Sequence, residues 1–328
     1  MDSCINGGAD DVMADLWNPV PMHKIYYLIL LGFVVSCTHN HREFAYVVNS
    51  EQVDHVDRIQ LVYRDGSIAD LKKQSDHWTL NDSLYAWDPP INTLLETMAR
   101  MRVRFIPTEA SRPTILADLA TQSVKVNVFE GGKMNRTFYI GGVTEDEQGT
   151  YYMAEPDGIP LVIDIPGWQG ALRSRFVMGI NDWRDRHLMH YAKDEIHTLE
   201  VQYPQNQASG FKMERSGTGW RLTLPTAEAP GNPSEALLDN YWFDLLDVGV
   251  ESYEDAPKDK QRILAESPYC RITLVKADQT QETFSFYPIQ EMGRTERYWI
   301  VLSNGQWILA QTRILQKIFK SNAYFFNQ

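Results

Sequence analysis

Residues 115–128 read ILADLATQSVKVNV, a short helical pattern followed by a strand in which apolar residues alternate from Val124 onward. A similar order returns at residues 263–274, ILAESPYCRITL, where ILA recurs and apolar residues again alternate from Ile272. Apolar residues at every second position are typical of a strand that buries one face. The two stretches therefore predict the same helix-and-strand unit at two places in the chain.

The correspondence extends over most of the chain in an unchanged order. Matching positions, with the earlier residue first, are Trp78 and Trp220, Leu80 and Leu222, Leu94 and Leu237, Phe138 and Phe284, Ile140 and Phe286, Tyr152 and Tyr298, Leu172 and Leu315, and Phe176 and Phe319. One match arises easily by chance, whereas a long ordered series indicates an internal repeat. We therefore predict an α+β fold of two tandem copies, residues 51–180 and 181–328, each a mainly antiparallel sheet with packed helices.

Local patterns predict the elements of each copy. In the first copy, strands are expected over 55–63, 67–73, 77–80, 150–154 and 159–163, with turns at Asp65-Gly66 and Gly131-Gly132. A helix is expected to have Asp88 as its N-cap and Pro89 as its first residue, with Asn232 and Pro233 in the same roles in the second copy. A closing helix is expected over 168–176.

A different signal precedes both copies, at residues 25–37, IYYLILLGFVVSC. This apolar run follows Lys24, is too short to cross a bilayer as a mature helix, and is typical of a secretory signal. Its ending, VVSC, resembles the lipobox of bacterial lipoproteins, in which the chain is cut before the cysteine and the cysteine is acylated. The resemblance implies lipid attachment at Cys37. The alternative is a buried core segment, because short apolar runs are ambiguous by themselves.

Residues 1–36 are accordingly interpreted as a signal-peptide region. Residues 1–21 contain four aspartates and no lysine or arginine, which does not suit the positive start of a signal. We therefore expect translation to begin at Met22. The polar residues 37–50 are expected to form a tether between the lipid and the folded body. The predicted location is the bacterial cell envelope, at the outer membrane or on the periplasmic face, because Thr38 rather than aspartate follows the cysteine.

The net charge limits the kinds of binding partner to be expected, and the cysteine content limits the disulfides. The formal net charge of −12 disfavours a nucleic-acid partner and direct adhesion to anionic lipid, so membrane contact is expected through the lipid anchor. After Cys37 the only cysteine is Cys270, so no intramolecular disulfide framework is expected. Cys270 alternates with Ile272 and Leu274, which predicts a buried strand position rather than a reactive nucleophile.

No sequence pattern predicts catalysis, a metal or a cofactor. His187, His190 and His197 do not follow the spacing of a metal motif such as HExxH. The stretch GGVTEDEQG at 141–149 lacks a Walker lysine and carries acids that would repel phosphate. We therefore expect a non-enzymatic protein without metal or cofactor. An acid–base glycan hydrolase is the least favoured alternative.

The joint between the copies reads GINDWRDR over residues 179–186. A tandem unit of strand, W-x-L, capped helix, I-L-A, hairpin and this charged segment resembles the bacterial family named domain of unknown function 4340. The resemblance covers nearly the whole chain after Cys37 and implies an envelope protein. Some members resemble auxiliary subunits of gliding-motility-type ABC transporters, although this chain lacks their further transmembrane helices. The family supplies no catalytic residues.

The joint also provides the candidate binding residues. Trp183 and Trp242 are predicted to line a groove between the copies, beside Arg184, Asp185 and Arg186, because tryptophan suits the apolar face of a sugar. The leading hypothesis is a lipid-anchored, non-enzymatic binding or scaffold protein that contacts an envelope protein, auxiliary to a transport or assembly complex. The alternative is a glycan-binding or small-ligand-binding protein that uses this groove.

Overall fold

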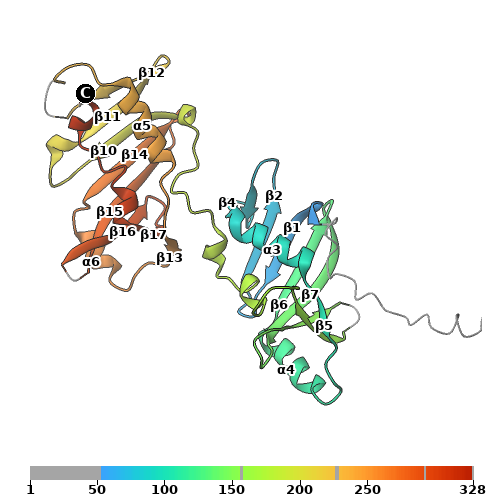
Figure 1. Ribbon diagram of the computed structural model, residues 1–328. Coiled ribbons are helices and arrows are strands. Elements are labelled where there is room, and N and C mark those ends of the chain that lie inside the picture. The colour runs from blue at the N-terminus through green and yellow to red at the C-terminus, as the bar shows by residue number, and fades with distance from the viewer. Residues whose placement is uncertain (1–52, 156–157, 226–228, 292, 327–328) are drawn as a thin grey trace, which may run out of the picture. The chain divides into compact units, whose positions relative to one another are not determined.

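The computed structural model describes residues 53–155, 158–225, 229–291 and 293–326. These residues form two sheets of antiparallel strands with a few helices (Figure 1), which confirms the predicted α+β class. The predicted signal region, the lipid-attachment residue Cys37 and the whole tether over residues 37–50 lie outside the described residues. Within the described ranges, no helix is long and apolar enough to span a membrane.

The first sheet has nine strands in the order β4-β3-β2-β1-β6-β7-β8-β9-β5. Its strands are β1 (Val56–Val62), β2 (Ile68–Lys73), β3 (Trp78–Leu80), β4 (Leu84–Tyr85), β5 (Arg102–Phe105), β6 (Val124–Glu130), β7 (Lys133–Val143), β8 (Thr150–Ala154) and β9 (Pro160–Asp164). Helix α3 (Asp88–Arg100) precedes β5 and helix α4 (Arg112–Gln122) follows it. The pairing of β1 with β6 joins the strands before the helices to those after them.

The second sheet has eight strands in the order β12-β11-β10-β14-β15-β16-β17-β13. Its strands are β10 (Ile196–Gln202), β11 (Phe211–Ser216), β12 (Gly219–Thr223), β13 (Ser252–Glu254), β14 (Cys270–Lys276), β15 (Gln281–Glu291), β16 (Arg294–Leu302) and β17 (Trp307–Gln311). The helices are α5 (Glu235–Leu246), α6 (Lys260–Ala265) and α7 (Thr312–Leu315). Short 3-10 helices are η1 (Arg173–Arg175), η2 (Ile180–Trp183), η3 (Lys193–Glu195), η4 (Gln207–Ser209) and η5 (Asn322–Phe326). With β4 set aside, the order of strands along the chain and across the sheet is the same in both sheets.

The hairpin of β6 and β7 shows how the alternating sequence produces the first core. Val124 pairs with Ile140 and Val126 with Phe138, and all four side chains are buried on the same face. The chain reverses at Gly131-Gly132, where both residues have a positive φ that glycine tolerates without steric cost. Strand β6 and the turn were predicted from the sequence.

Helices α3 and α5 begin at different residues from those predicted. The N-cap of α3 is Trp87, in extended conformation, and Asp88 is the first helical residue, where its charge favours the helix N-terminus. The N-cap of α5 is Ser234 rather than Asn232, because the backbone is still extended at Ser234 after Pro233. Each helix buries an apolar face, which includes Ile91 and Leu94 in α3 and Leu238 and Trp242 in α5.

The predicted closing helix over 168–176 is wrong. Only η1 forms there, because Gly167 and Gly170 have φ values of +77° and +106°, which are incompatible with a continuous right-handed helix. Strand β5, sequence RVRF, was not predicted because its apolar positions are too few to show alternation. It nevertheless forms an edge of the first sheet by pairing with β9.

Each sheet has its own hydrophobic core. In the first, Ile91, Leu94 and Met98 of α3 pack with buried strand residues, and in the second Leu238 and Trp242 of α5 do the same. Cys270 is fully buried in the second core, as predicted, and burial raises the pKa of its thiol well above the ordinary value. A thiol in this state is a poor nucleophile.

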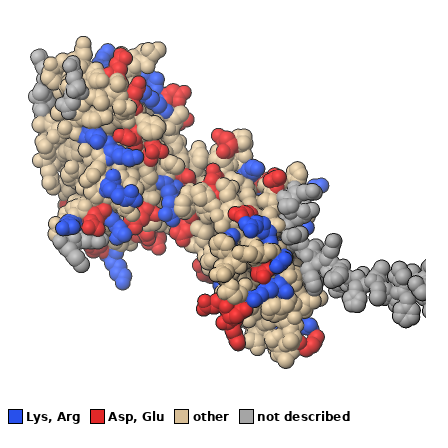
Figure 2. Space-filling model, viewed as in Figure 1, with Lys and Arg blue, Asp and Glu red and all other residues tan. Residues whose placement is uncertain are grey.

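Charged side chains of both signs are intermixed on the face of the described residues drawn in Figure 2. No continuous basic surface is visible on that face. A nucleic-acid site would require basic side chains gathered on one face or along one groove.

The adjacent aromatic residues Trp242 and Phe243 provide a matched test of the second core, because the first is 1% exposed and the second 70%. We expect Trp242→Ala to lower the free energy of unfolding by about 3–5 kcal/mol, since it leaves a large cavity. Phe243→Ala should change it by about 0.5 kcal/mol or less. Urea unfolding followed by tryptophan fluorescence and circular dichroism measures both. Equal losses in the two variants would contradict this description of the core.

Candidate functional site

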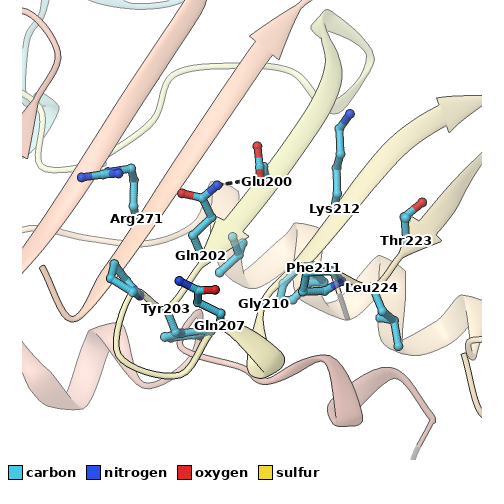
Figure 3. A pocket seen from close by; sticks show the side chains of 13 residues that line it. Glu200, Gln202, Tyr203, Gln207, Gly210, Phe211, Lys212, Thr223, Leu224 and Arg271 are labelled. Carbon is cyan, nitrogen blue, oxygen red and sulfur yellow. Dashed lines mark hydrogen bonds between the residues drawn. The ribbon is translucent and has the colours of Figure 1, made fainter. Parts of the chain in front are cut away.

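The second sheet contains a pocket of about 540 Å³ at the end where β10 meets β11. Figure 3 shows side chains from β10, β11, β12 and β14 around it, together with the loop that follows β10. The apolar part of the lining includes Tyr203, Phe211 and Leu224, and the polar part includes Gln202, Gln207 and Arg271. Its volume lies within the range of small-molecule sites.

The loop over residues 203–210 is fixed by hydrogen bonds to the end of the chain. The Tyr203 hydroxyl donates to the carbonyl oxygen of Lys320 at 2.8 Å. The side-chain amide nitrogen (Nδ2) of Asn322 donates to the carbonyl oxygens of Ala208 at 2.7 Å and Gly210 at 3.0 Å. These contacts hold both ends of the loop, so the pocket is formed in advance rather than on binding.

Gly210 allows the loop to lie against β10. A Cβ atom at this position would be 2.8 Å from the carbonyl oxygen of Val201 and 3.3 Å from that of Gln207. Both contacts are with backbone atoms, which cannot move away as a side chain can. The close approach therefore requires glycine at the point where the loop enters β11.

Polar side chains form a row across the strands above the pocket (Figure 3). Gln202 is paired with Arg271 of β14, and Glu200 with Lys212 of β11. The Gln202 amide donates to a Glu200 carboxylate oxygen at 2.6 Å. Lys212 forms an ion pair with Glu214 at 2.5 Å. The row thus combines amide, carboxylate and cationic groups beside an apolar floor, an arrangement suited to binding.

Trp183 and Trp242, which were predicted to line a groove between the copies, are both buried. Trp183 is fully buried in the core of the first sheet, where its indole nitrogen donates to the Tyr63 hydroxyl at 2.9 Å. Trp242 is buried in the core of the second sheet and packs against Trp220 with ring centroids 4.4 Å apart. The prediction that these two indoles line one ligand groove is therefore wrong.

The charged residues of the joint make local contacts. Arg184 donates to the Gln306 side-chain oxygen at 2.9 Å, and its guanidinium lies 3.5 Å from the centre of the Tyr253 ring. Burial lowers the pKa of Arg184 below its ordinary value. The guanidinium of Arg186 lies 4.2 Å from the centre of the Trp87 ring. These cation–π contacts position the joint, and the prediction that Arg184 and Arg186 contact a ligand stays a prediction.

Asp185 of the joint contacts the two histidines that follow it in the sequence, His187 and His190. One of its carboxylate oxygens accepts from the backbone N–H of His187 at 2.7 Å and lies 2.8 Å from the Nδ1 of that ring. The same oxygen lies 3.5 Å from Nε2 of His190, which stacks on Tyr85 with ring centroids 4.2 Å apart. Among the residues that the structure describes, no group of three or more His, Cys, Asp or Glu side chains is arranged to hold a metal ion.

Comparison with known proteins identifies the family but no activity. The family model described as Domain of unknown function (DUF4340) matches residues 78–267, more than half of the chain. The chain belongs to this family. The DUF4340 match begins at β3 and ends just after α6, so it includes strands of both sheets and the joint between them in sequence. The resemblance predicted from sequence is thereby confirmed.

No curated protein and no solved structure matches the chain. The DUF4340 description itself names no ligand or reaction. The pocket was not predicted from the sequence, because its residues form no recognised motif. One signal was present, since Pro204 and Gly210 bracket a connection that is longer than the Asp65-Gly66 turn at the corresponding place in the first sheet.

Gly210→Ala tests whether the pocket loop depends on close backbone packing. We expect a loss of about 1–3 kcal/mol in the free energy of unfolding, because the added methyl group overlaps two carbonyl oxygens. Gly219 at the start of β12 is the matched control, since a Cβ there meets nothing within 4 Å. Gly219→Ala should cost about 0.5 kcal/mol or less in chemical denaturation. An equal effect of the two substitutions would show that the loop is not packed as described.

His190, which follows the joint, should also make the free energy of unfolding depend on pH. Burial lowers the pKa of His190 below 6.5, although Asp185 opposes the shift and His187, His77 and Arg184 add to it. The folded protein then binds fewer protons than the unfolded chain, so stability is lost as the pH falls through about 6.5. We expect His190→Gln to flatten the dependence between about pH 5.5 and 7.5 in urea unfolding. An unchanged or steeper dependence would contradict the prediction.

Proposed function

We propose that this chain is a lipid-anchored, non-enzymatic binding protein of the bacterial cell envelope, built from two tandem copies of one α+β unit. The observation that carries the binding role is the preformed pocket of the second sheet. The anchor rests on the apolar run that ends at Cys37. A scaffold role toward an envelope protein in a transport or assembly complex is compatible with the same anchor.

The proposed duplication is supported by two independent features of the sheets. The strand order of the first sheet without β4 matches that of the second, strand for strand. In addition, β1 has a register shift between Val56 and Arg58 where it pairs with β6, and β10 has one between Ile196 and Thr198 where it pairs with β14. An irregularity at the same place in corresponding strands is difficult to explain by convergence on a favourable topology alone.

The chemistry of the pocket favours binding over catalysis. Its lining supplies apolar surface, two glutamine amides and the charged groups of Glu200, Lys212 and Arg271. Among the described residues, the lining includes no histidine, cysteine, serine or aspartate, and its one carboxylate, Glu200, accepts a hydrogen bond from the Gln202 amide instead of standing beside a nucleophile. We therefore infer that a ligand is held in this pocket rather than converted there.

The glycan-binding alternative loses its main support with the burial of Trp183 and Trp242. Sugar recognition commonly uses an exposed aromatic face, and neither indole offers one. Trp168 is 51% exposed, but the guanidinium of Arg175 lies 4.3 Å from the centre of its ring. We therefore prefer the pocket of the second sheet to an aromatic groove as the ligand site.

Cys37→Ala tests the proposed anchor. We expect this variant, expressed from the full sequence in a bacterial host, to leave the membrane fraction and to lack the mass of an acylated N-terminal cysteine. Cys4→Ala is the matched control and should keep both properties, because Cys4 precedes the proposed cleavage site. Cell fractionation and intact-mass spectrometry measure the outcome. A wild-type protein with an uncleaved, unacylated N-terminus would contradict the anchor.

A further inference from the structure

Among the residues that the structure describes, Arg271 in the pocket lining forms no ion pair. It lies at the start of β14, with Gln202 and Ser285 as its neighbours on the adjacent strands, and both of these are uncharged. Within the described ranges, its partly exposed guanidinium has no ion-pair or hydrogen-bond partner. The planar fork of an arginine is suited to pairing with a carboxylate through two parallel hydrogen bonds.

The first sheet shows a different arrangement at the corresponding place. Lys125 of β6 lies between Val62 of β1 and Tyr139 of β7, as Arg271 lies between strands of the second sheet. Lys125 forms an ion pair with Glu155 at 3.4 Å and lies 5.6 Å from the centre of the Tyr139 ring. The protein thus neutralises the cation of the first sheet and leaves that of the second sheet available.

The two sheets also differ in the connection beside this cation. In the first sheet, β1 and β2 are joined by a tight turn in which the N–H of Tyr63 donates to the carbonyl oxygen of Ser67 at 2.9 Å. In the second, the loop over residues 203–210 replaces that turn and forms a wall of the pocket. In the second sheet, a cation without an ion-pair partner among the described residues and a pocket therefore occur together. In the first sheet, the corresponding cation is paired and the corresponding connection is a tight turn.

The wall of the pocket beside the loop is apolar. Leu224 and the prolines at 204 and 225 supply this surface. Tyr203 adds little to it, because its hydroxyl donates to the Lys320 carbonyl oxygen and its ring is buried against Tyr269 in the second core. A ligand that fits has an apolar body, because a fully polar one would lose its hydration against these groups without compensation.

We propose that the pocket binds a carboxylate carried on an apolar body, with the carboxylate on Arg271 and the body against Leu224 and the prolines at 204 and 225. The inference rests on the binding function proposed above and names its ligand class. An acyl chain and the C-terminus of an apolar peptide share this chemistry. The guanidinium pairs with the carboxylate through charge-assisted hydrogen bonds, and the apolar lining provides the remaining affinity.

Isothermal titration of the purified chain with decanoate, decanol, acetate and the dipeptide Leu-Leu tests the proposal. We expect decanoate or Leu-Leu to bind saturably, and decanol and acetate to bind at least about tenfold more weakly, because each lacks one half of the required chemistry. Whichever of decanoate and Leu-Leu binds more tightly identifies the source as an acyl chain or a peptide terminus.

Arg271→Gln should weaken the tighter probe by about tenfold or more, with the melting temperature little changed. Arg221→Gln is the matched control, because it removes the same charge from exposed β12 outside the lining and should change affinity less than about twofold. Absence of saturable binding by both carboxylates, or equal losses in the two variants, would overturn the proposal. That result would not contradict the proposed lipid anchor, because the Cys37→Ala experiment measures membrane association and not ligand binding.

Discussion

The pairing of the first strand of each sheet with the strand that follows its second helix is the contact on which the fold depends. In the first sheet, Ile59 lies opposite Val128 and Leu61 opposite Val126, and in the second Leu199 and Val201 lie opposite Leu274 and Ile272. All eight side chains are buried. Because each pairing joins strands on either side of two helices, the sheet becomes one surface that the helices can cover.

The same pairing produces the candidate site. Arg271 is distant from Gln202 in sequence, and the antiparallel register of β10 and β14 places them side by side. The loop over residues 203–210 is then held by Asn322, so that the strands and the loop line the pocket. A site built on paired strands is more rigid than one built on loops alone, which suits recognition of a ligand without large rearrangement.

Much of the fold could be predicted from the sequence because its signals are local. Val124, Val126 and Val128 alternate without interruption, and Gly131-Gly132 supplies the positive φ values of the turn. The helix expected over 168–176 failed because glycines at positions 167 and 170 favour left-handed backbone. Strand β5 was missed because its partner β9 is remote in sequence and its own pattern is dominated by arginine.

The candidate site was less predictable, since it depends on which surfaces remain uncovered. Trp242 follows Leu238 by four residues and precedes Leu245 by three, a helical spacing that indicates burial, and its acidic neighbours concealed this signal. Trp183 lies in a polar segment, yet its indole is buried beside Tyr63 of the first sheet. Arg271 stands out only when its strand neighbours are known, and single-sequence reasoning does not provide them.

Hydrogen exchange of individual backbone amides tests most directly whether these two long-range pairings hold the sheets together. The account predicts that the amides hydrogen-bonded between β1 and β6, and those hydrogen-bonded between β10 and β14, exchange last in their sheets. The free energy of opening of these amides should be close to the free energy of global unfolding. Early exchange of these amides, while the hairpins on either side stay protected, would contradict it. That result would mean that each sheet is two separate antiparallel units rather than one.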